Sequence, residues 1–251
     1  MKRLPDTSWS PDQPGIDSFL REAEIVDSGM IASSSNYVFL LQFETPEMEE
    51  PGFGVYKPEK GESPLWDFPP SLYKREVATY LISEALGWRL VPPTVERSEG
   101  LEHGVGSIQL FIAGDQSCTY FDLRDEHADT MRRFATFDWL TNNADRKGGH
   151  ILQASDGQLW GIDHGLTLHE EEKLRTVIWD YAGEAVPDDC LVDVAALQAQ
   201  LNPGQPLVES LQPYLNDSEL AMLRSRAAEI LGVPTFPQPP DWRRPYPWPL
   251  V

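Results

Sequence analysis

Two loops decide how this chain is interpreted: Asn143-Ala144-Asp145-Arg146-Lys147-Gly148-Gly149-His150 and Gly161-Ile162-Asp163-His164-Gly165. Two short segments of strand type lie between the two loops, and Ser155-Asp156-Gly157 separates these segments. Because Asp-Gly is a strong signal for a tight turn between antiparallel strands, the sequence predicts a hairpin here. The hairpin brings Asp145 and Asp163 to the same end.

The two aspartates fit the requirements of phosphoryl transfer. This chemistry needs a cation on the phosphates, carboxylates that hold metal, and a base for the acceptor hydroxyl. We expect Asp145 to be that base or to orient the hydroxyl, while Arg146 and Lys147 favour its ionised form and help to neutralise the transferred phosphate. Asp163 shortly precedes Gly165 and is the expected magnesium ligand. Either aspartate alone would be interpreted as an ordinary turn residue.

The N-terminal half supplies a candidate for the cation. Lys57 ends a strand-type segment, from which it would point its ammonium group into a cleft. Glu76, on the helix expected next, is its natural partner, although each residue alone would be a solvated surface group. Ser34 and Ser35, followed by Asn36, could place hydroxyls and backbone N–H groups over phosphates without a glycine-rich loop.

Hydrophobic periodicity and turn signals predict an α+β fold with two lobes and a junction near Gly114. We expect a lead-in at 1–24, a β-rich lobe with one helix at 25–113, a mainly helical lobe carrying the short hairpin at 114–232, and a tail at 233–251. The expected strands span 37–41, 54–57, 91–95 and 107–112, and the expected helices span 16–23, 73–86, 128–142, 191–201 and 217–231.

The tail from Val233 to Pro249 interleaves prolines with aromatic residues, which predicts an extended segment. It could wrap the surface of its own chain or present a peptide to a partner, and the sequence leaves both open.

Composition limits the partners. Forty acidic and twenty basic residues among 251 give a formal charge of -20, which repels nucleic acid and anionic lipid surfaces. No apolar run is long enough for a membrane span, and we expect a cytoplasmic protein. Cys118 and Cys190 have neither a disulfide nor a zinc spacing, so they are expected to be reduced structural thiols. No Gly-x-x-x-x-Gly-Lys-Ser/Thr motif is present, which excludes a P-loop NTPase.

The loops resemble those of the phosphatidylinositol 3- and 4-kinase-like branch of the protein kinase fold, most closely a group of small actinobacterial proteins in that branch. The segment that begins at Asp145 is similar to its catalytic Asp-Arg-x-x-x-Asn motif, and Asp163-His164-Gly165 matches its Asp-x-Gly metal motif. Phe137 to Arg146 also resembles HipA-type kinases. Val55-Tyr56-Lys57-Pro58 and Trp160 to Leu166 resemble type II phosphatidylinositol 4-kinases.

The resemblance implies a bilobal, protein kinase-like fold and an ATP-dependent kinase that uses Mg²⁺ or Mn²⁺. It also implies that the segment from Gln109 through Phe111 to Ile112 forms the hinge that receives adenine. The expected acceptor is a hydroxyl of a protein or of a small soluble molecule, and a lipid acceptor is disfavoured by the acidic charge.

His150 departs from the family pattern, because the superfamily usually has an asparagine there that holds a second metal. Magnesium prefers oxygen ligands, so His150 either joins a manganese-tolerant site or leaves one metal on Asp163. Two alternatives to a kinase remain open. One is a nucleotide-binding pseudokinase or regulatory module, and the other is an enzyme of the same fold that transfers AMP or an amino-acid group.

Overall fold

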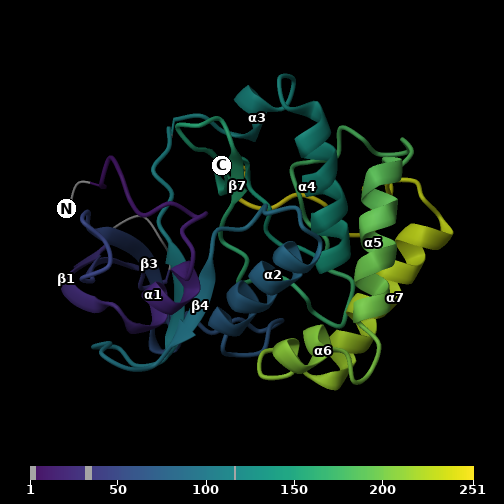
Figure 1. The fold of residues 1–251 in the computed structure, drawn as a ribbon. Coiled ribbons are helices and arrows are strands. Elements are labelled where there is room, and N and C mark those ends of the chain that lie inside the picture. Colours follow the sequence, from purple (N-terminus) through teal and green to yellow (C-terminus); the bar gives the residue numbers. More distant parts are fainter. Residues whose placement is uncertain (1–3, 32–35, 116) are drawn as a thin grey trace.

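The computed structural model describes residues 4–31, 36–115 and 117–251. A twisted antiparallel sheet forms one side of the molecule, and a group of helices forms the other (Figure 1). The hairpin of β6 (Ile151–Gln153) and β7 (Leu159–Gly161) lies with the helical part. The expected α+β architecture is therefore confirmed.

The N-terminal sheet has five strands in the spatial order β1-β2-β3-β5-β4, and every neighbouring pair is antiparallel. Alternation of buried and half-exposed residues along β3 shows why this segment is a strand, since one face packs on the core. The strands span Glu24–Met30 (β1), Phe39–Glu44 (β2), Gly52–Pro58 (β3), Thr94–Arg97 (β4) and Gly106–Leu110 (β5).

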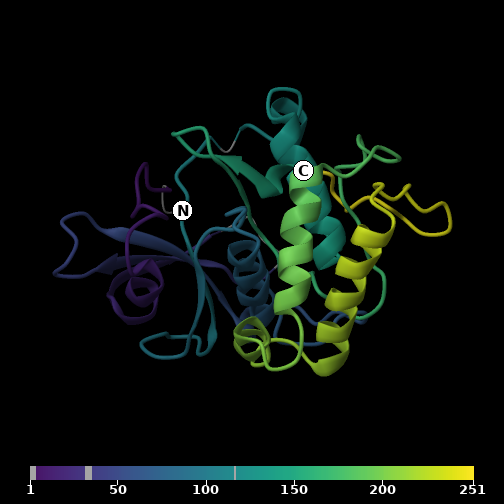
Figure 2. The ribbon, with the colours of Figure 1, turned by 45° about the vertical axis from the view of Figure 1, so that its right-hand side comes forward.

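The C-terminal lobe is mainly helical. Its longest helices, α4, α5 and α7, lie beside one another, and the tail passes along the same side of the molecule (Figure 2). Helix α7 begins with a capping box in which Asn216 and Glu219 exchange side-chain to backbone hydrogen bonds. The helices of this lobe span Tyr120–Leu123 (α3), Ala128–Thr141 (α4), Asp188–Gln200 (α5), Pro206–Leu211 (α6) and Asp217–Gly232 (α7).

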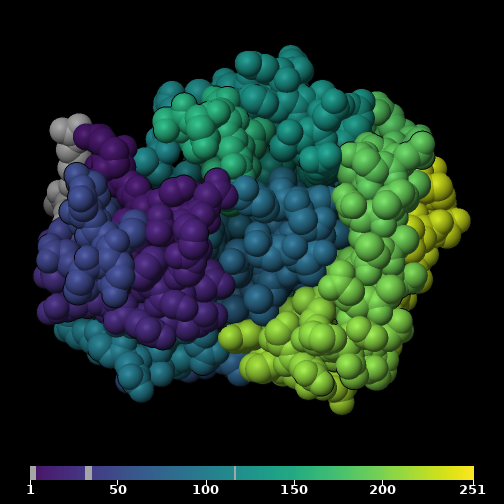
Figure 3. Space-filling model, viewed as in Figure 1, coloured from purple at the N-terminus to yellow at the C-terminus, as the bar shows by residue number. Residues whose placement is uncertain are grey.

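Helix α2 (Tyr73–Ala85) joins the two lobes, while α1 (Ile16–Glu22) packs on the sheet. Arg75 on α2 is 3% exposed, donates to the backbone carbonyl of Thr167 at 2.6 Å, and forms an ion pair with Glu219 of α7. The hydroxyls of Thr79 and Thr167 are 2.8 Å apart. These buried contacts hold α2 against the helical lobe, and Figure 3 shows the α2 segment in blue beside α5 and α6.

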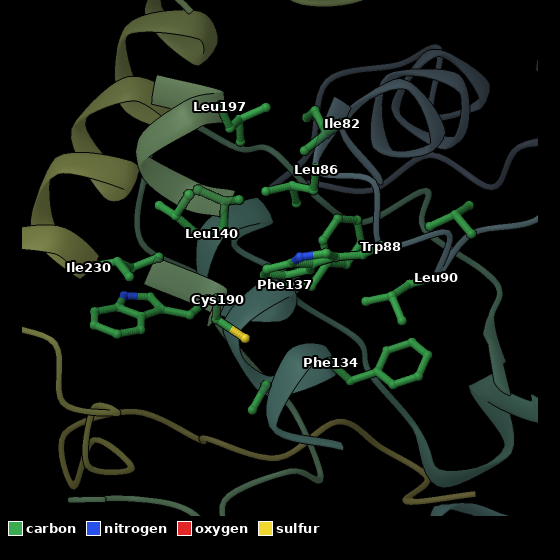
Figure 4. Close-up of a cluster of buried hydrophobic side chains, with 14 of the residues drawn as sticks. Ile82, Leu86, Trp88, Leu90, Phe134, Phe137, Leu140, Cys190, Leu197 and Ile230 are labelled. Carbon is green, nitrogen blue, oxygen red and sulfur yellow. The ribbon is translucent and has the colours of Figure 1, made fainter. Parts of the chain in front are cut away.

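Two hydrophobic clusters stabilise the two sides. The smaller one lies under the sheet and includes Phe43, Tyr56 and Ile108. The larger one fills the helical lobe and includes residues of α2 as well as α4, α5 and α7. Figure 4 shows part of it, with Ile82 of α2 and Leu86, the residue just after α2, facing Leu140 and Leu197.

Several elements differ from the sequence-based expectations. Strand β1 was not predicted as a separate strand, because its exposed, partly acidic residues lack a clear alternation. The short helices α3 and α6 were also not predicted, since one or two turns carry little periodicity. Among the described residues, no helix has the length and apolar composition needed to cross a membrane.

The C-terminal tail lies against its own domain. The carbonyl of Pro245 accepts hydrogen bonds from the backbone N–H of Thr176 and from the indole N–H of Trp179, both at 3.1 Å. Arg243 donates to the carbonyl of Leu174 at 2.6 Å. The tail therefore runs beside the segment that follows the predicted metal loop.

Candidate active site

A cleft between the sheet and the helical lobe gathers most of the residues singled out in the sequence. It encloses about 430 Å³, which is large enough for a small-molecule ligand. Its walls include apolar residues of the sheet and of the hairpin, such as Val55 and Leu152. The predicted residues among its lining are Asn36, Lys57, Glu76, Gln109, Phe111, Ile112, Asp145, Lys147, His150 and Asp163.

Lys57 at the end of β3 links two acidic side chains. Its Nζ atom lies 2.5 Å from Oε1 of Glu76 and 2.7 Å from Oδ1 of Asp163. Burial opposes the charge on Lys57, but the attraction of Asp163 and Glu76 outweighs burial and raises the pKa of the lysine. The same cation holds the pKa of Asp163 well below its usual range. Lys57 and Asp163 are therefore charged together at neutral pH.

The backbone of the predicted metal loop is arranged to present Asp163 to the cleft. Asp163 has φ of 61°, an uncommon conformation for a residue with a side chain, and its carboxylate is 49% exposed. The next residue, His164, donates its backbone N–H to Oε2 of Glu76 at 2.9 Å. A Cβ atom at Gly165 would lie 3.4 Å from Oε1 of Glu76, so a larger residue would crowd this contact. Glu76 thus positions both Lys57 and the loop.

The predicted catalytic loop is organised around Asp138 of α4, which is fully buried. Asp138 accepts hydrogen bonds from the side chains of Arg146, Asn143 and Thr176 at 3.0 to 3.2 Å. The side-chain oxygen of Asn143 in turn accepts a hydrogen bond from the backbone N–H of Asp145 at 3.0 Å. This bond fixes the backbone conformation at Asp145. Asp138 and Asn143 were not predicted as site residues from the sequence. An aspartate within an otherwise apolar helical stripe was the available signal, because such a charge needs a buried partner.

The expectation that Arg146 acts on the transferred phosphate is not supported by its position. Arg146 has no exposed surface and does not line the cleft. Besides Asp138, its guanidinium contacts Nε2 of His164 at 2.7 Å and the carbonyl of His150 at 3.2 Å. Arg146 therefore joins the two loops from inside the lobe, and its charge is used in a buried ion pair.

Asp145 and Lys147 do face the cleft, with Nζ of Lys147 3.1 Å from Oδ2 of Asp145. The sequence analysis expected neighbouring cations to favour the ionised form of Asp145. Instead, burial is the larger effect and raises the pKa of Asp145, although Lys147 opposes the shift. A raised pKa improves a carboxylate as a proton acceptor, since it brings the proton affinity closer to working pH.

His150 ends the short 3-10 helix η2 (Gly148–His150) and lies beside Asp163. Its Nε2 atom is 3.3 Å from Oδ2 of Asp163, and its Nδ1 atom accepts from the backbone N–H of Lys147 at 3.5 Å. Burial lowers the pKa of His150 to about 4, despite the opposing effect of Asp163. The imidazole is therefore neutral at pH 7, and its Nε2 atom lies on the side of Asp163.

The predicted hinge, from Gln109 to Ile112, comprises the end of β5 and the two residues after it, and it lines the cleft. Gln109 donates its side-chain amide to the hydroxyl of Thr94 at 2.9 Å, and the backbone N–H of Phe111 donates to the carbonyl of Phe53 at 2.9 Å. Phe111 and Ile112 line the cleft. Ser34 and Ser35 lie outside the described residues, while Asn36 is part of the cleft wall.

The residues near Asp163 suit a metal that is also held by phosphate. Within residues 4–31, 36–115 and 117–251, no group of three or more His, Cys, Asp or Glu side chains forms a metal cage. Mg²⁺ in nucleotide sites is bound by one or two carboxylates, with phosphates and water as the other ligands. Asp163 supplies one half-exposed carboxylate, and His150 supplies a neutral imidazole next to it. These two residues would hold the ion.

Solved structures of kinases share the fold. The crystal structure of the Golgi casein kinase with Mn/ADP bound superposes with a TM-score of 0.55 at 13% identity, covering 87% of this chain and 74% of that one. The Helicobacter pylori proinflammatory kinase CtkA superposes with a TM-score of 0.51 at 11% identity. The superposition covers 86% of this chain and 94% of CtkA. At these identities the similarity concerns the fold alone.

Sequence relatives give the family. "Phosphatidylinositol 4-kinase gamma 4" of Arabidopsis thaliana is 30% identical over 135 residues, which cover 44% of this chain and 24% of that protein. "Protein Rv2133c" of Mycobacterium tuberculosis is 41% identical over 266 residues, which cover 92% of this chain and 93% of that protein. A family model described as phosphatidylinositol 3- and 4-kinase matches residues 67–200. The chain therefore belongs to the phosphatidylinositol 3- and 4-kinase family.

Proposed function

We propose that this protein is an ATP- and divalent-metal-dependent kinase that phosphorylates a hydroxyl group. One observation carries the proposal: Lys57 is held between Glu76 and Asp163 in the same cleft that Asp145 and Lys147 line. This set provides a cation for the phosphates, a carboxylate for the metal and a base for the acceptor, which are the parts that phosphoryl transfer requires.

Each residue has a distinct proposed role. Lys57 binds the phosphates of ATP, and Glu76 positions Lys57. Asp163 and His150 hold Mg²⁺ or Mn²⁺, which would neutralise phosphate charge when bound. Asp145 accepts the proton of the acceptor hydroxyl, and its raised pKa supports this role.

Lys147 is within ion-pair distance of Asp145 and is the remaining cation positioned to contact the transferred phosphate. We assign Arg146 a structural role, because it is buried behind the loop. The adenine ring is expected to lie against Gln109, Phe111 and Ile112, between apolar residues of the sheet and the hairpin.

We propose a protein or a small soluble molecule as the acceptor. Although related proteins are named as phosphatidylinositol kinases, the formal charge of -20 opposes binding to an anionic membrane surface. Cys118 and Cys190 are both free, which agrees with a cytoplasmic location.

His150 motivates a second candidate, a nucleotide-binding pseudokinase. Its imidazole occupies the position of an expected metal-binding asparagine and contacts Asp163. If His150 prevents metal binding, the protein would bind nucleotide without transferring phosphate. A third candidate is an enzyme of the same fold that transfers AMP, and the experiment described next distinguishes all three.

The decisive experiment incubates the full chain with ATP labelled at either the α- or the γ-phosphate, in the presence of Mg²⁺ or Mn²⁺. Bacterial lysate, a pool of soluble metabolites and phosphatidylinositol vesicles serve as separate acceptor mixtures. Transfer of γ-label to the first or second mixture supports the proposal, whereas transfer to vesicles would overturn the choice of acceptor. Transfer of α-label identifies an AMP transferase, and thermal stabilisation by ATP without any transfer identifies a pseudokinase.

A further inference from the structure

A second cavity, of about 590 Å³, lies in the helical lobe away from the ATP cleft. Its walls come from the end of α4, from α7, from the segment after the metal loop and from the tail. None of its lining residues belongs to the lining of the cleft. The flat or apolar side chains around it are Trp139, Leu174, Trp179, Met222 and Trp242.

Arg226 of α7 lines this cavity and is 6% exposed. Its Nε atom donates to the carbonyl of Leu140 at 2.8 Å, and its Nη1 atom donates to the carbonyl of His169 at 3.3 Å. Both bonds fix the orientation of the guanidinium plane. The remaining nitrogen, Nη2, is buried and has no hydrogen-bond partner among the described residues.

A buried guanidinium group with an unpartnered nitrogen and no carboxylate bound to it is unusual. Buried charges are normally paired, since removing an ion from water without a counter-charge is costly. Arg75 and Arg146 follow that rule through Glu219 and Asp138. Arg226 instead contacts two neutral carbonyls. Burial lowers its pKa to about 10, although the charges of Glu229 and Glu219 oppose the shift, so it remains charged at neutral pH.

We propose that this cavity is a binding site for a small monocarboxylate with a flat apolar body. The carboxylate accepts a charge-assisted hydrogen bond from Nη2 of Arg226, and the body of the ligand lies among the tryptophan side chains. Its volume falls within the range of ordinary small-molecule sites.

Charge at the mouth of the cavity restricts the ligand further. Glu172, Glu229 and Asp241 are exposed lining residues, and Glu172 is paired with Arg243 at 2.8 Å. These carboxylates repel a ligand with several negative charges more than one with a single charge. Nucleotides and inorganic phosphate should therefore bind this cavity more weakly than a monocarboxylate, which separates its expected ligand from that of the ATP cleft.

The site also borders the loops that carry the proposed active residues. Leu140 is close to the end of α4, just before the loop of Asp145, and His169 follows the loop of Asp163. Because Arg226 contacts the backbone of both, a bound carboxylate would make the orientation of that side chain more rigid. The existence of the site does not depend on the proposed kinase activity.

The test measures binding of phenylacetate to the full chain by saturation-transfer NMR and tryptophan fluorescence. Phenylacetamide is the neutral control of similar shape, and inorganic phosphate is the polyanion control. We expect saturable binding of phenylacetate, binding of phenylacetamide at least about tenfold weaker, and no binding of phosphate. ATP should not displace phenylacetate. Equal binding of the acid and the amide, displacement by ATP, or no saturable binding would overturn the proposal.

Variants assign the binding to this cavity. Arg226→Lys should weaken phenylacetate binding by about tenfold, because the fixed guanidinium geometry is lost. If that variant does not fold, Trp242→Ala provides the test, since Trp242 is a 71% exposed wall residue whose removal leaves the core intact. Trp66→Ala is the matched control, because Trp66 is 96% exposed and does not line the cavity. Unchanged binding in the Trp242 variant, or an equal loss in the Trp66 variant, would contradict the assignment.

Discussion

Lys57 and Glu76 form the central contact between the sheet and α2, with Nζ of Lys57 2.5 Å from Oε1 of Glu76. Glu76 is 3% exposed, and its second oxygen accepts the backbone N–H of His164. One carboxylate therefore positions the proposed phosphate-binding lysine and the loop of the proposed metal ligand at the same time.

Replacing Glu76 should consequently affect both stability and nucleotide use. In Glu76→Gln, a buried partner of Lys57 loses its charge, and we expect the free energy of unfolding to fall by about 3 kcal/mol. ATP turnover should fall by roughly a hundredfold, since Lys57 loses its fixed position. Urea unfolding and an ATP assay measure the two effects. Glu84→Gln is the control, because Glu84 is exposed on the same helix, and an equal loss in that variant would contradict the role of Glu76.

Asp145→Asn should abolish turnover while leaving nucleotide binding almost unchanged. The amide cannot accept the hydroxyl proton, and we expect a loss of about 10² to 10⁴-fold in kcat. Stabilisation by ATP in a thermal unfolding assay should persist, since Lys57 and Asp163 are intact. Asp156→Asn, in the exposed turn of the hairpin, is the matched control. If Asp145→Asn keeps the wild-type turnover, the assignment of the base is wrong.

His150 should make folding stability dependent on pH. Its pKa falls from 6.5 to about 4 on folding, so the unfolded chain binds the proton more tightly. The stabilising effect of the neutral form is complete above about pH 6.5 and decreases as the pH falls toward 4. Between about pH 7.5 and pH 5, His150 should account for a loss of about 2 kcal/mol.

The comparison that isolates this effect is between the wild type and His150→Asn. The variant lacks the titrating group, so its unfolding free energy should fall less over the same pH range. Parallel pH profiles for the two proteins would show that His150 is not responsible. The same variant tests metal choice, because an amide oxygen should favour Mg²⁺ over Mn²⁺ relative to the imidazole.

The buried pair of Arg146 and Asp138 should be important for stability. Arg146→Met leaves Asp138 buried without its counter-charge, and we expect a loss of about 3 to 5 kcal/mol in the free energy of unfolding. Adding Asp138→Leu should recover part of that loss, since no unpaired charge remains. Arg133→Met is the control, because the Arg133–Asp189 pair is largely exposed and should contribute less than about 1 kcal/mol. A stable Arg146→Met protein without turnover would instead indicate a direct catalytic role.

A side chain at position 148 should displace the C-terminal tail. Its backbone N–H donates to the carbonyl of Leu250 at 2.7 Å, and a Cβ atom would lie 2.9 Å from the ring of Phe121 and 3.4 Å from that carbonyl. We therefore expect Gly148→Ala to increase hydrogen exchange at residues 245–251. Gly232→Ala serves as a control for the substitution itself, because no atom lies within 4 Å of a Cβ added at Gly232 and its φ is not in the left-handed region. Unchanged exchange in the tail of Gly148→Ala would show that the contact is not tight.

The sequence allowed the helices with long apolar stripes and the strands with clear alternation to be predicted. It also indicated that Lys57, Glu76 and Asp163 belong together, because their order along the chain and their residue types are informative. The contact of Glu76 with the backbone of His164 could not be predicted, since it depends on how α2 packs against a distant loop.

Arg146 shows why local reasoning about charge has limits. In the sequence it is adjacent to Asp145, and adjacency suggested that it acts on the same substrate. In the structure, the two side chains leave the loop in different directions, and Arg146 meets Asp138 of α4 inside the lobe. Burial likewise reversed the expected pKa shift of Asp145, and burial is a property of the folded chain. The residues around Arg226 come from four separate segments, so no local pattern could have revealed that cavity.

The contact between the last residues and the catalytic loop has a practical consequence for protein production. A Cβ atom at Gly149 would lie 3.7 Å from Cγ1 of Val251, so the chain leaves the molecule beside that loop. An affinity tag fused after Val251 would emerge next to the residues proposed to perform catalysis. Leu4 lines the cleft that holds those residues, so assays of this protein should use a chain from which any tag has been removed.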